Sequence, residues 1–239
     1  MKFGRILSVL AILVMIACVV QPVLADTEFD NGSAASAYYN RGSMAASSGQ
    51  FDAAVELFNL ALTSNTSLVA KSDTLQYIYN DKSAALTDLG RYEDAVTTAD
   101  QGLALFKKAP GLWNNKGYAL YKLGKYDDAV SAYKMAISIA EASNTSYPKG
   151  YINMGIALNA AGKPYDAITA FNKALELDPG NSAATAGLTE AQSAAMKTNI
   201  VLAVIVIIAL GLVIWYVKFR KPADSKATSG KKDRKSKKE

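Results

Sequence analysis

Two pairs of adjacent carboxylates are the side chains in this sequence whose types and spacing could support chemistry. They are Glu93 with Asp94 and Asp127 with Asp128. Paired carboxylates can act as general acid and general base. Each pair, however, falls in the first turn of a predicted helix, where acidic side chains interact favourably with the positive end of the helix dipole. We therefore assign both pairs to helix starts rather than to catalysis.

Other catalytic side chains are scarce. The sequence has no His, and its single cysteine, Cys18, lies in an apolar leader. The chain after the leader therefore offers no imidazole base, no thiolate and no His/Cys metal site, and it has no Gly-rich phosphate loop. Lipidation of Cys18 is an alternative, but apolar residues continue past it without the expected preceding Leu. We expect no enzyme activity, cofactor or metal.

Four predicted turns recur along the chain. Each begins with a Gly that is followed by an aromatic residue two or three positions later and by an Ala five positions later. The glycines, which recur at nearly regular intervals, are Gly49, Gly90, Gly124 and Gly162. Their spacing is close to the period of stacked helix-turn-helix units, which is about 34 residues. Gly can end the first helix of each unit because it adopts a left-handed conformation without steric cost.

Upstream of each Gly, three residues fall on one face of a predicted helix: an aromatic residue, a small one four positions later and an apolar one three positions after that. The small residue should let a partner helix approach closely beside the ring. Burial of such a ring stabilises by roughly 1.5 to 3 kcal/mol. The sets are Tyr38, Gly42 and Ala45; Tyr79, Ser83 and Leu86; Trp113, Gly117 and Leu120; Tyr151, Gly155 and Leu158.

This pattern resembles the tetratricopeptide repeat family over about residues 35–181. The run from Trp113 to Gly117 and the run from Ala174 to Pro179 match the family pattern well, whereas Ala99 and Gly102 depart from it. The resemblance implies an all-α helix-turn-helix solenoid of about four repeats, at 35–68, 76–109, 110–143 and 148–181. An unrelated helical bundle is the alternative, but four coincident registers argue against it. Residues 182–198 form an Ala-rich segment that we expect to cap the solenoid.

Two apolar segments predict a membrane protein. Residues 1–25 have the basic start, apolar run and small-residue site of a signal peptide, with an uncleaved anchor as the alternative. Residues 26–34 form an N-terminal linker. Residues 199–217 are predicted to form a transmembrane helix because 200–217 carries no charge and is nearly long enough to span the hydrocarbon core. A buried core helix is the alternative.

Charge predicts the orientation in the membrane. The leader carries +2, residues 26–217 carry −4 and the tail 218–239 carries +7. Basic flanks stay cytoplasmic, so we expect a single-pass protein of the cell membrane with a cytoplasmic C-terminus and extracytoplasmic repeats. The mildly acidic repeat region argues against nucleic-acid binding. The basic tail has two interpretations, contact with anionic lipid and a solvated flank that only stops translocation.

The resemblance also implies a peptide or protein partner in a concave groove lined by the first helix of each repeat. We expect the stripe one residue beyond the buried stripe to line it, and this stripe is neutral rather than basic as in chaperone-binding members. Alternatively, its tyrosines are only partly exposed helix residues. The predicted groove residues are Tyr39, Asn80, Asn114, Tyr118, Tyr121, Ile152, Ile156 and Asn159.

Three Asn-X-Ser/Thr sequons, at Asn31, Asn65 and Asn144, are candidate glycosylation sites, all outside the predicted helices. The predicted function is thus a non-enzymatic protein-interaction scaffold displayed on the outer face of the cell membrane. Two alternatives stay open. One is an intracellular tail-anchored adaptor or co-chaperone, and the other is an enzyme that uses side chains discounted above.

Overall fold

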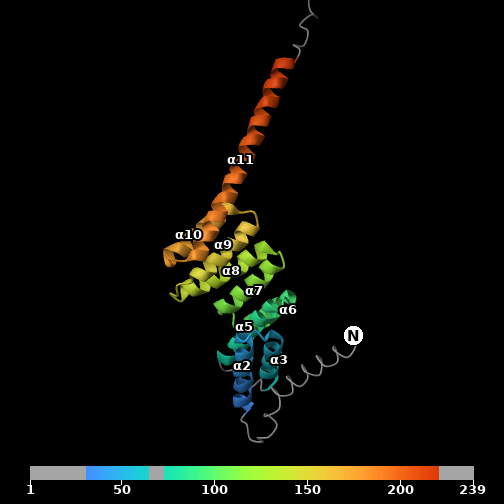
Figure 1. Cartoon of the computed structure of the whole chain (residues 1–239), viewed down its shortest axis with the longest axis vertical. Helices are drawn as coiled ribbons and strands as arrows, with labels where there is room; N and C mark the ends of the chain where they lie inside the picture. Colours follow the sequence, from blue (N-terminus) through green and yellow to red (C-terminus); the bar gives the residue numbers. More distant parts are fainter. Residues whose placement is uncertain (1–30, 65–72, 221–239) are drawn as a thin grey trace, which may run out of the picture. The chain divides into compact units, whose positions relative to one another are not determined.

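The computed structural model describes residues 31–64 and 73–220. Within these ranges the chain forms nine α-helices and no strand, and consecutive helices pack in pairs (Figure 1). The predicted all-α repeat architecture is therefore confirmed. The paired helices are α2 (Asn31–Ser47) with α3 (Phe51–Ser64), α5 (Asp73–Asp88) with α6 (Tyr92–Leu105), α7 (Pro110–Lys122) with α8 (Tyr126–Ala142), and α9 (Pro148–Ala160) with α10 (Pro164–Leu177); α11 (Ser182–Phe219) follows them.

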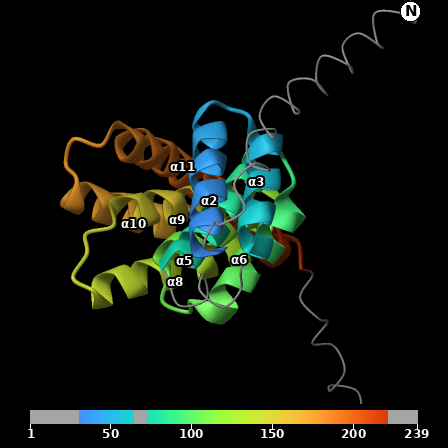
Figure 2. The same ribbon diagram turned by 90° about the horizontal axis from the view of Figure 1, so that it is seen from below.

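By their internal contacts the described residues divide into two compact units, with the division between Ala191 and Gln192. The first unit holds all four helix pairs together with the start of α11. In the view from below, the paired helices α2 and α3 lie side by side (Figure 2). The second unit contains the remainder of α11.

The turn inside each helix pair has the predicted conformation. Gly49, Gly90, Gly124 and Gly162 have φ values of 74°, 75°, 74° and 72°. Their backbone hydrogen bonds close the preceding helix. In the first pair, the Gly49 amide donates to the Ala46 carbonyl (3.0 Å) and the Gln50 amide donates to the Ala45 carbonyl (2.9 Å). A side chain at these positions would be strained, so glycine fixes where each first helix ends.

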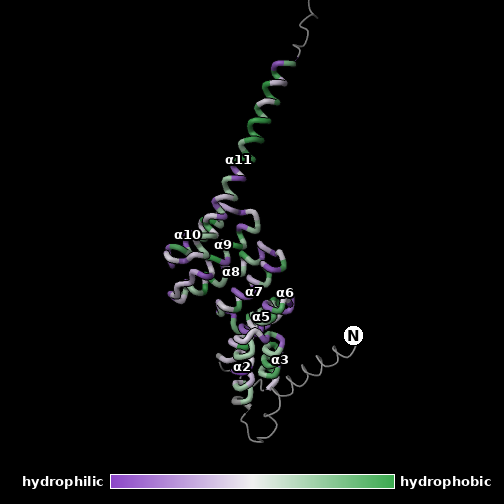
Figure 3. Tube along the Cα trace, in the orientation of Figure 1, coloured by the Kyte–Doolittle hydropathy of each residue, from purple (hydrophilic) through white to green (hydrophobic). Residues whose placement is uncertain are grey.

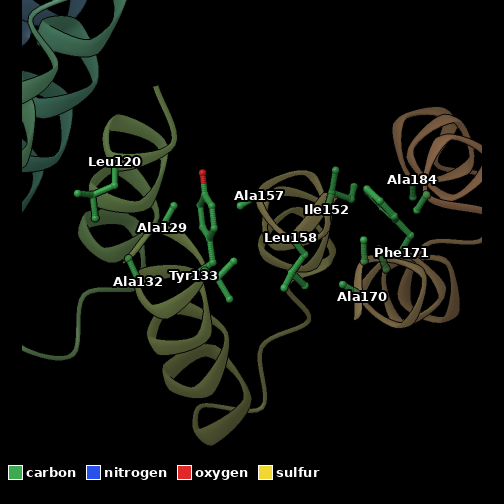
Figure 4. Packing of buried hydrophobic residues seen from close by; sticks show 14 residues of the cluster. Leu120, Ala129, Ala132, Tyr133, Ile152, Ala157, Leu158, Ala170, Phe171 and Ala184 are labelled. Atoms are coloured by element: carbon green, nitrogen blue, oxygen red, sulfur yellow. The ribbon is translucent and has the colours of Figure 1, made fainter. Parts of the chain in front are cut away.

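An aromatic ring fits against a small residue within three of the four pairs. A Cβ added to Gly117 would lie 2.8 Å from Cε1 of Tyr133, and one added to Gly155 would lie 2.8 Å from Cζ of Phe171. Gly42 faces Phe58 in the same way. Figure 4 shows Tyr133 and Phe171 projecting into the space between helices, where both are about 1% exposed. The close approach at the small residue is as predicted, but the ring against it comes from the second helix of the pair. The expectation that the first-helix aromatics are the buried rings is wrong, because all four are only half-buried: Tyr38, Tyr79, Trp113 and Tyr151.

The second pair solves the same packing problem with smaller residues. Ser83 takes the place of the glycine and Ala99 takes the place of the ring, and both are fully buried. Gly102, which departs from the family pattern, lies against Tyr79 and Leu112, since a Cβ there would approach each to 2.8 Å. The second pair therefore lacks the contact of a ring with a small residue, and its Gly102 instead leaves room for Leu112 of α7.

Helix α11 runs through two segments that were predicted separately, the cap at 182–198 and the transmembrane helix at 199–217. No Gly or Pro lies between Lys197 and Ile200, so nothing in the sequence breaks the helix there. By length and composition α11 is the one helix of the described residues that could cross a membrane. Figure 3 shows its later turns as mostly hydrophobic. The predicted signal peptide lies outside the described residues.

Candidate functional site

The first helices of the repeats form one layer. α2 contacts α5, α5 contacts α7, and α7 contacts α9. Among the described helices, the second helices α3, α6 and α8 pack on the first helix of the next pair and not substantially on one another. Within the described helices, first helices therefore contact one another along the array and second helices do not substantially, as expected on the concave side of a helical repeat array. This inner face, made by α2, α5, α7 and α9, is the candidate binding surface.

Four of the predicted groove residues follow directly after the half-buried aromatic of their first helix, and these four contact a neighbouring repeat. The Tyr39 hydroxyl donates to Oδ2 of Asp81 (2.9 Å). Burial and this hydrogen bond raise the pKa of Tyr39 above its usual 10.0. Oδ1 and the carbonyl oxygen of Asn80 accept hydrogen bonds from Nδ2 of Asn115 at 3.2 and 2.8 Å.

Asn114 and Ile152 are each only 8% exposed. Oδ1 of Asn114 accepts a hydrogen bond from Nδ2 of Asn153 (2.9 Å), and Ile152 belongs to the buried cluster in Figure 4. The expectation that these two side chains line an open groove is wrong. Adjacent first helices contact each other directly, so the position after the aromatic faces the neighbouring helix instead of solvent.

Exposed side chains occur one turn further along the same helices. Tyr118 on α7 and Ile156 on α9 are each 39% exposed and occupy equivalent positions of neighbouring first helices that contact one another. Nζ of Lys122 lies 5.2 Å from the centroid of the Tyr118 ring, and a hydrogen bond with Tyr118 raises the pKa of Lys122. This strip, made by Tyr118 and Ile156, has the Lys122 ammonium group beside its tyrosine.

Tyr121 and Asn159 lie a further turn along and are half-buried. The Tyr121 ring packs against the main core and lies 5.7 Å from the ring of Tyr126, at an interplanar angle of 49°. Tyr121 thus supports the inner face more than it projects from it. The exposed part of the predicted set is reduced to Tyr118 and Ile156.

Asn115 and Asn153 were missed by the sequence analysis. Both donate to the preceding first helix, Asn115 to Asn80 and Asn153 to Asn114. A signal for them was present, because the second position after each repeat's aromatic is always polar: Asn40, Asp81, Asn115 and Asn153. When a polar residue recurs at the same position of each repeat, next to buried positions, it indicates a hydrogen bond between repeats.

The candidate glycosylation sites differ in their setting. Asn144 lies in the turn after α8, is exposed and has a φ of 52°. Asn31 is the first residue of α2, so the expectation that it lies outside a helix is wrong. Asn65 falls outside the described residues.

The carboxylate pairs lie where the sequence predicted, in the first turns of α6 and α8. Asp94 pairs with Arg91 (2.6 Å), and Asp127 pairs with Lys163 (2.7 Å). In the part of the chain that the structure describes, no group of three or more His, Cys, Asp or Glu side chains is arranged to hold a metal ion. The carboxylates thus lie at helix starts, where Asp94 and Asp127 also form surface ion pairs.

Comparison with known proteins identifies the repeats. Tetratricopeptide repeat family models match residues 35–67 and 108–180. The structure is similar to a crystal structure of MamA protein, with 19% identity, a TM-score of 0.57 and coverage of 81% of this chain and 99% of that one. MamA 41-end from Desulfovibrio magneticus RS-1 is 22% identical, with a TM-score of 0.55 and coverage of 73% and 95%.

The first TPR domain of the human RPAP3 protein is 25% identical, with a TM-score of 0.50 and coverage of 54% of this chain and 98% of that one. A comparison with curated protein sequences finds no match. The likeness to solved structures therefore concerns the helical repeat fold.

Proposed function

The chain is a tetratricopeptide repeat protein, and we propose that its inner face binds a peptide or protein segment through apolar contacts centred on α7 and α9. The observation that carries this proposal is the pair of exposed side chains Tyr118 and Ile156 at equivalent positions of adjacent first helices. Tyrosine is among the residue types that most often anchor a protein interface. The proposed role is that of a non-catalytic scaffold.

The partner should be apolar or neutral where it contacts this strip. Lys122 is the only charged side chain that the described contacts place beside Tyr118, and it stacks on the ring instead of projecting alone. The buried amides next to the strip are satisfied by hydrogen bonds between repeats. These hydrogen bonds fix the arrangement of the first helices, and the affinity for a partner comes from the exposed apolar side chains.

We propose further that the repeats are displayed on the outer face of a cell membrane, anchored by the apolar part of α11. The helix has the length and composition of a membrane span. Trp215, Tyr216 and Phe219 near its end are the kind of side chain found at membrane interfaces, and Lys218 and Arg220 follow the cytoplasmic-flank pattern. Contact between the basic tail 218–239 and anionic lipid belongs to the same proposal.

Paired substitutions test the binding proposal. The double variant Tyr118→Ala with Ile156→Ala should lose a partner that the wild-type protein captures from solubilised membranes, with an unchanged circular dichroism spectrum. Truncation of one interface anchor typically costs about 2 kcal/mol or more. Tyr165→Ala on α10, 52% exposed, is the matched control. Equal capture by the double variant and the wild type would contradict the proposed surface.

The sequon at Asn144 tests the orientation. When the protein is inserted into endoplasmic reticulum microsomes, an exported repeat domain should gain a glycan that is lost in Asn144→Gln. A sequon added to the tail after Arg220 should remain unmodified. Glycosylation of the tail alone would reverse the orientation and support the tail-anchored intracellular alternative. That result would not bear on the proposed binding surface at Tyr118 and Ile156.

A further inference from the structure

A cavity of about 260 Å³ lies where the first two repeats meet. Residues of α3, α5 and α6 line it, among them Glu56, Asn59, Lys82, Thr97 and Gln101. It is distinct from the strip at Tyr118 and Ile156, because none of its lining residues belongs to α7 or α9. Its volume is below the roughly 300 to 1,000 Å³ of pockets for drug-sized ligands. It suits a molecule of about amino-acid size.

Lys82 is half-buried in the wall of this cavity. Among residues 31–64 and 73–220 its ammonium group finds neither a hydrogen-bond acceptor nor a salt-bridge partner. Burial and the nearby Arg91 lower the pKa of Lys82, while Asp94 and Glu56 act in the opposite direction. An ammonium group that is partly removed from water and has no partner is unfavourable, so an anion beside it would be stabilised.

The next repeat shows which anion fits. Lys116 stands one repeat after Lys82, at the interval that separates their turn glycines, and its Nζ lies 2.6 Å from Oδ1 of Asp100. By the same comparison of turn glycines, the residue equivalent to Asp100 in the preceding repeat is Asn59. Asn59 therefore stands where the carboxylate partner of Lys82 would be expected, and an amide cannot neutralise the ammonium group.

The other charged residues that line the cavity form no salt bridge with Lys82 in the described structure. Arg91, the residue before α6, pairs with Asp94 at 2.6 Å, so the Asp94 carboxylate already contacts another cation. Glu56 on α3 is exposed and forms no salt bridge with any described residue. Lys82 and Glu56 thus line one cavity as two opposite charges that do not contact each other. A ligand that carries both an anion and a cation would satisfy both.

We propose that this cavity binds a small amino acid, whose carboxylate contacts Lys82 in the place that Asp100 occupies beside Lys116, and whose ammonium group faces Glu56. Asn59, Thr97 and Gln101 supply hydrogen-bonding groups around the rest of the ligand. The repeat domain then carries a small-molecule site between its first two repeats, separate from the surface that binds a protein partner.

Calorimetric titration of the full-length protein in detergent tests this proposal with three probes, L-serine, L-glutamate and acetate. At least one of the amino acids should bind saturably and more tightly than acetate. Lys82→Gln should weaken that binding at least about tenfold, since the charge-assisted hydrogen bond to the ligand carboxylate is lost. Lys116→Gln is the matched control and should bind like the wild type.

Asn59→Asp supplies the missing carboxylate from within the chain. It should raise the melting temperature of the ligand-free protein and abolish amino-acid binding, because the new side chain pairs with Lys82 as Asp100 pairs with Lys116. The proposal is overturned if neither amino acid binds the wild-type protein, if acetate binds as tightly as they do, or if binding survives both Lys82→Gln and Asn59→Asp. Circular dichroism of each variant establishes that the helices are intact.

Discussion

The contact between Tyr133 and Gly117 predicts a strong energetic coupling between these two residues. A Cβ at residue 117 would lie 2.8 Å from Cε1 of Tyr133, whose ring is about 1% exposed and cannot move aside. Overpacking of this kind costs about 1 to 3 kcal/mol. Serine is a better helix former than glycine by about 0.5 kcal/mol. We therefore expect Gly117→Ser to destabilise the protein by roughly 0.5 to 2.5 kcal/mol.

Tyr133→Ala alone should cost roughly 3 to 5 kcal/mol through the cavity that it leaves. In that background Gly117→Ser should no longer destabilise, because the pair then reproduces Ser83 and Ala99, which are fully buried at the equivalent positions of the second repeat. Its hydroxyl also finds an acceptor, as Ser83 Oγ does at the Asn80 carbonyl oxygen (2.7 Å). The coupling free energy between the two substitutions should be about 1 to 3 kcal/mol.

Urea unfolding of the full-length protein in detergent, followed by far-ultraviolet circular dichroism, measures this coupling from the wild type, both single variants and the double variant. The pair Gly117→Ser with Tyr165→Ala is the control, and its effects should add because Tyr165 is 52% exposed on another helix. A coupling below about 0.5 kcal/mol between residues 117 and 133 would refute the large–small packing argument.

Four further outcomes are expected. Trp113→Ala should lower the free energy of unfolding by roughly 2 to 3 kcal/mol, less than for a fully buried ring because Trp113 is half-buried; a loss below about 1 kcal/mol would contradict its packing. Residues 26–197 alone should keep a helical circular dichroism spectrum in chelator and reductant, since they contain no Cys or His; a change on either addition would count against this. Burial and the hydrogen bond to Glu141 raise the pKa of Tyr151 from 10.0 to about 12, so absorbance titration should find this phenol ionising at a higher pH than a free tyrosine, and Glu141→Gln should lower its pKa. The free energy of unfolding should fall as pH rises from 10 to 12, because the folded protein retains a proton there that the unfolded chain loses. A tag after Glu239 should resist protease added to intact cells that digests the repeats, and its loss would reverse the proposed orientation.

Local features of the fold could be predicted because they depend on a few residues close in sequence. The turn glycines were identifiable since a positive φ favours glycine wherever it occurs. The small residues at the close approach within a pair were also identifiable from helical spacing, as Gly155 illustrates, whereas the ring that each one meets on the second helix was not. The continuity of α11 was missed because the polar residues around Thr198 resemble a boundary, although none of them breaks a helix.

The inner face was harder to predict because it depends on how closely neighbouring repeats approach. A position one residue away from a buried stripe can face either solvent or the next helix, and single-helix periodicity does not distinguish the two. Direct contact between first helices buries Asn114 and Ile152 and leaves Tyr118 and Ile156 exposed. The cavity at Lys82 needed a comparison between repeats, because the lysine is equivalent to Lys116 and only its partner differs.

Site-specific photo-crosslinking in intact cells tests the central claim of a protein-binding inner face most directly. A photoreactive amino acid at residue 118 on α7 should give a discrete crosslinked product of higher mass. The same group at residue 165, on the exposed side of α10, should give none. The product from residue 118 should also disappear when Ile156→Ala is added. Equal crosslinking from both positions, or crosslinking from residue 165 alone, would contradict the claim.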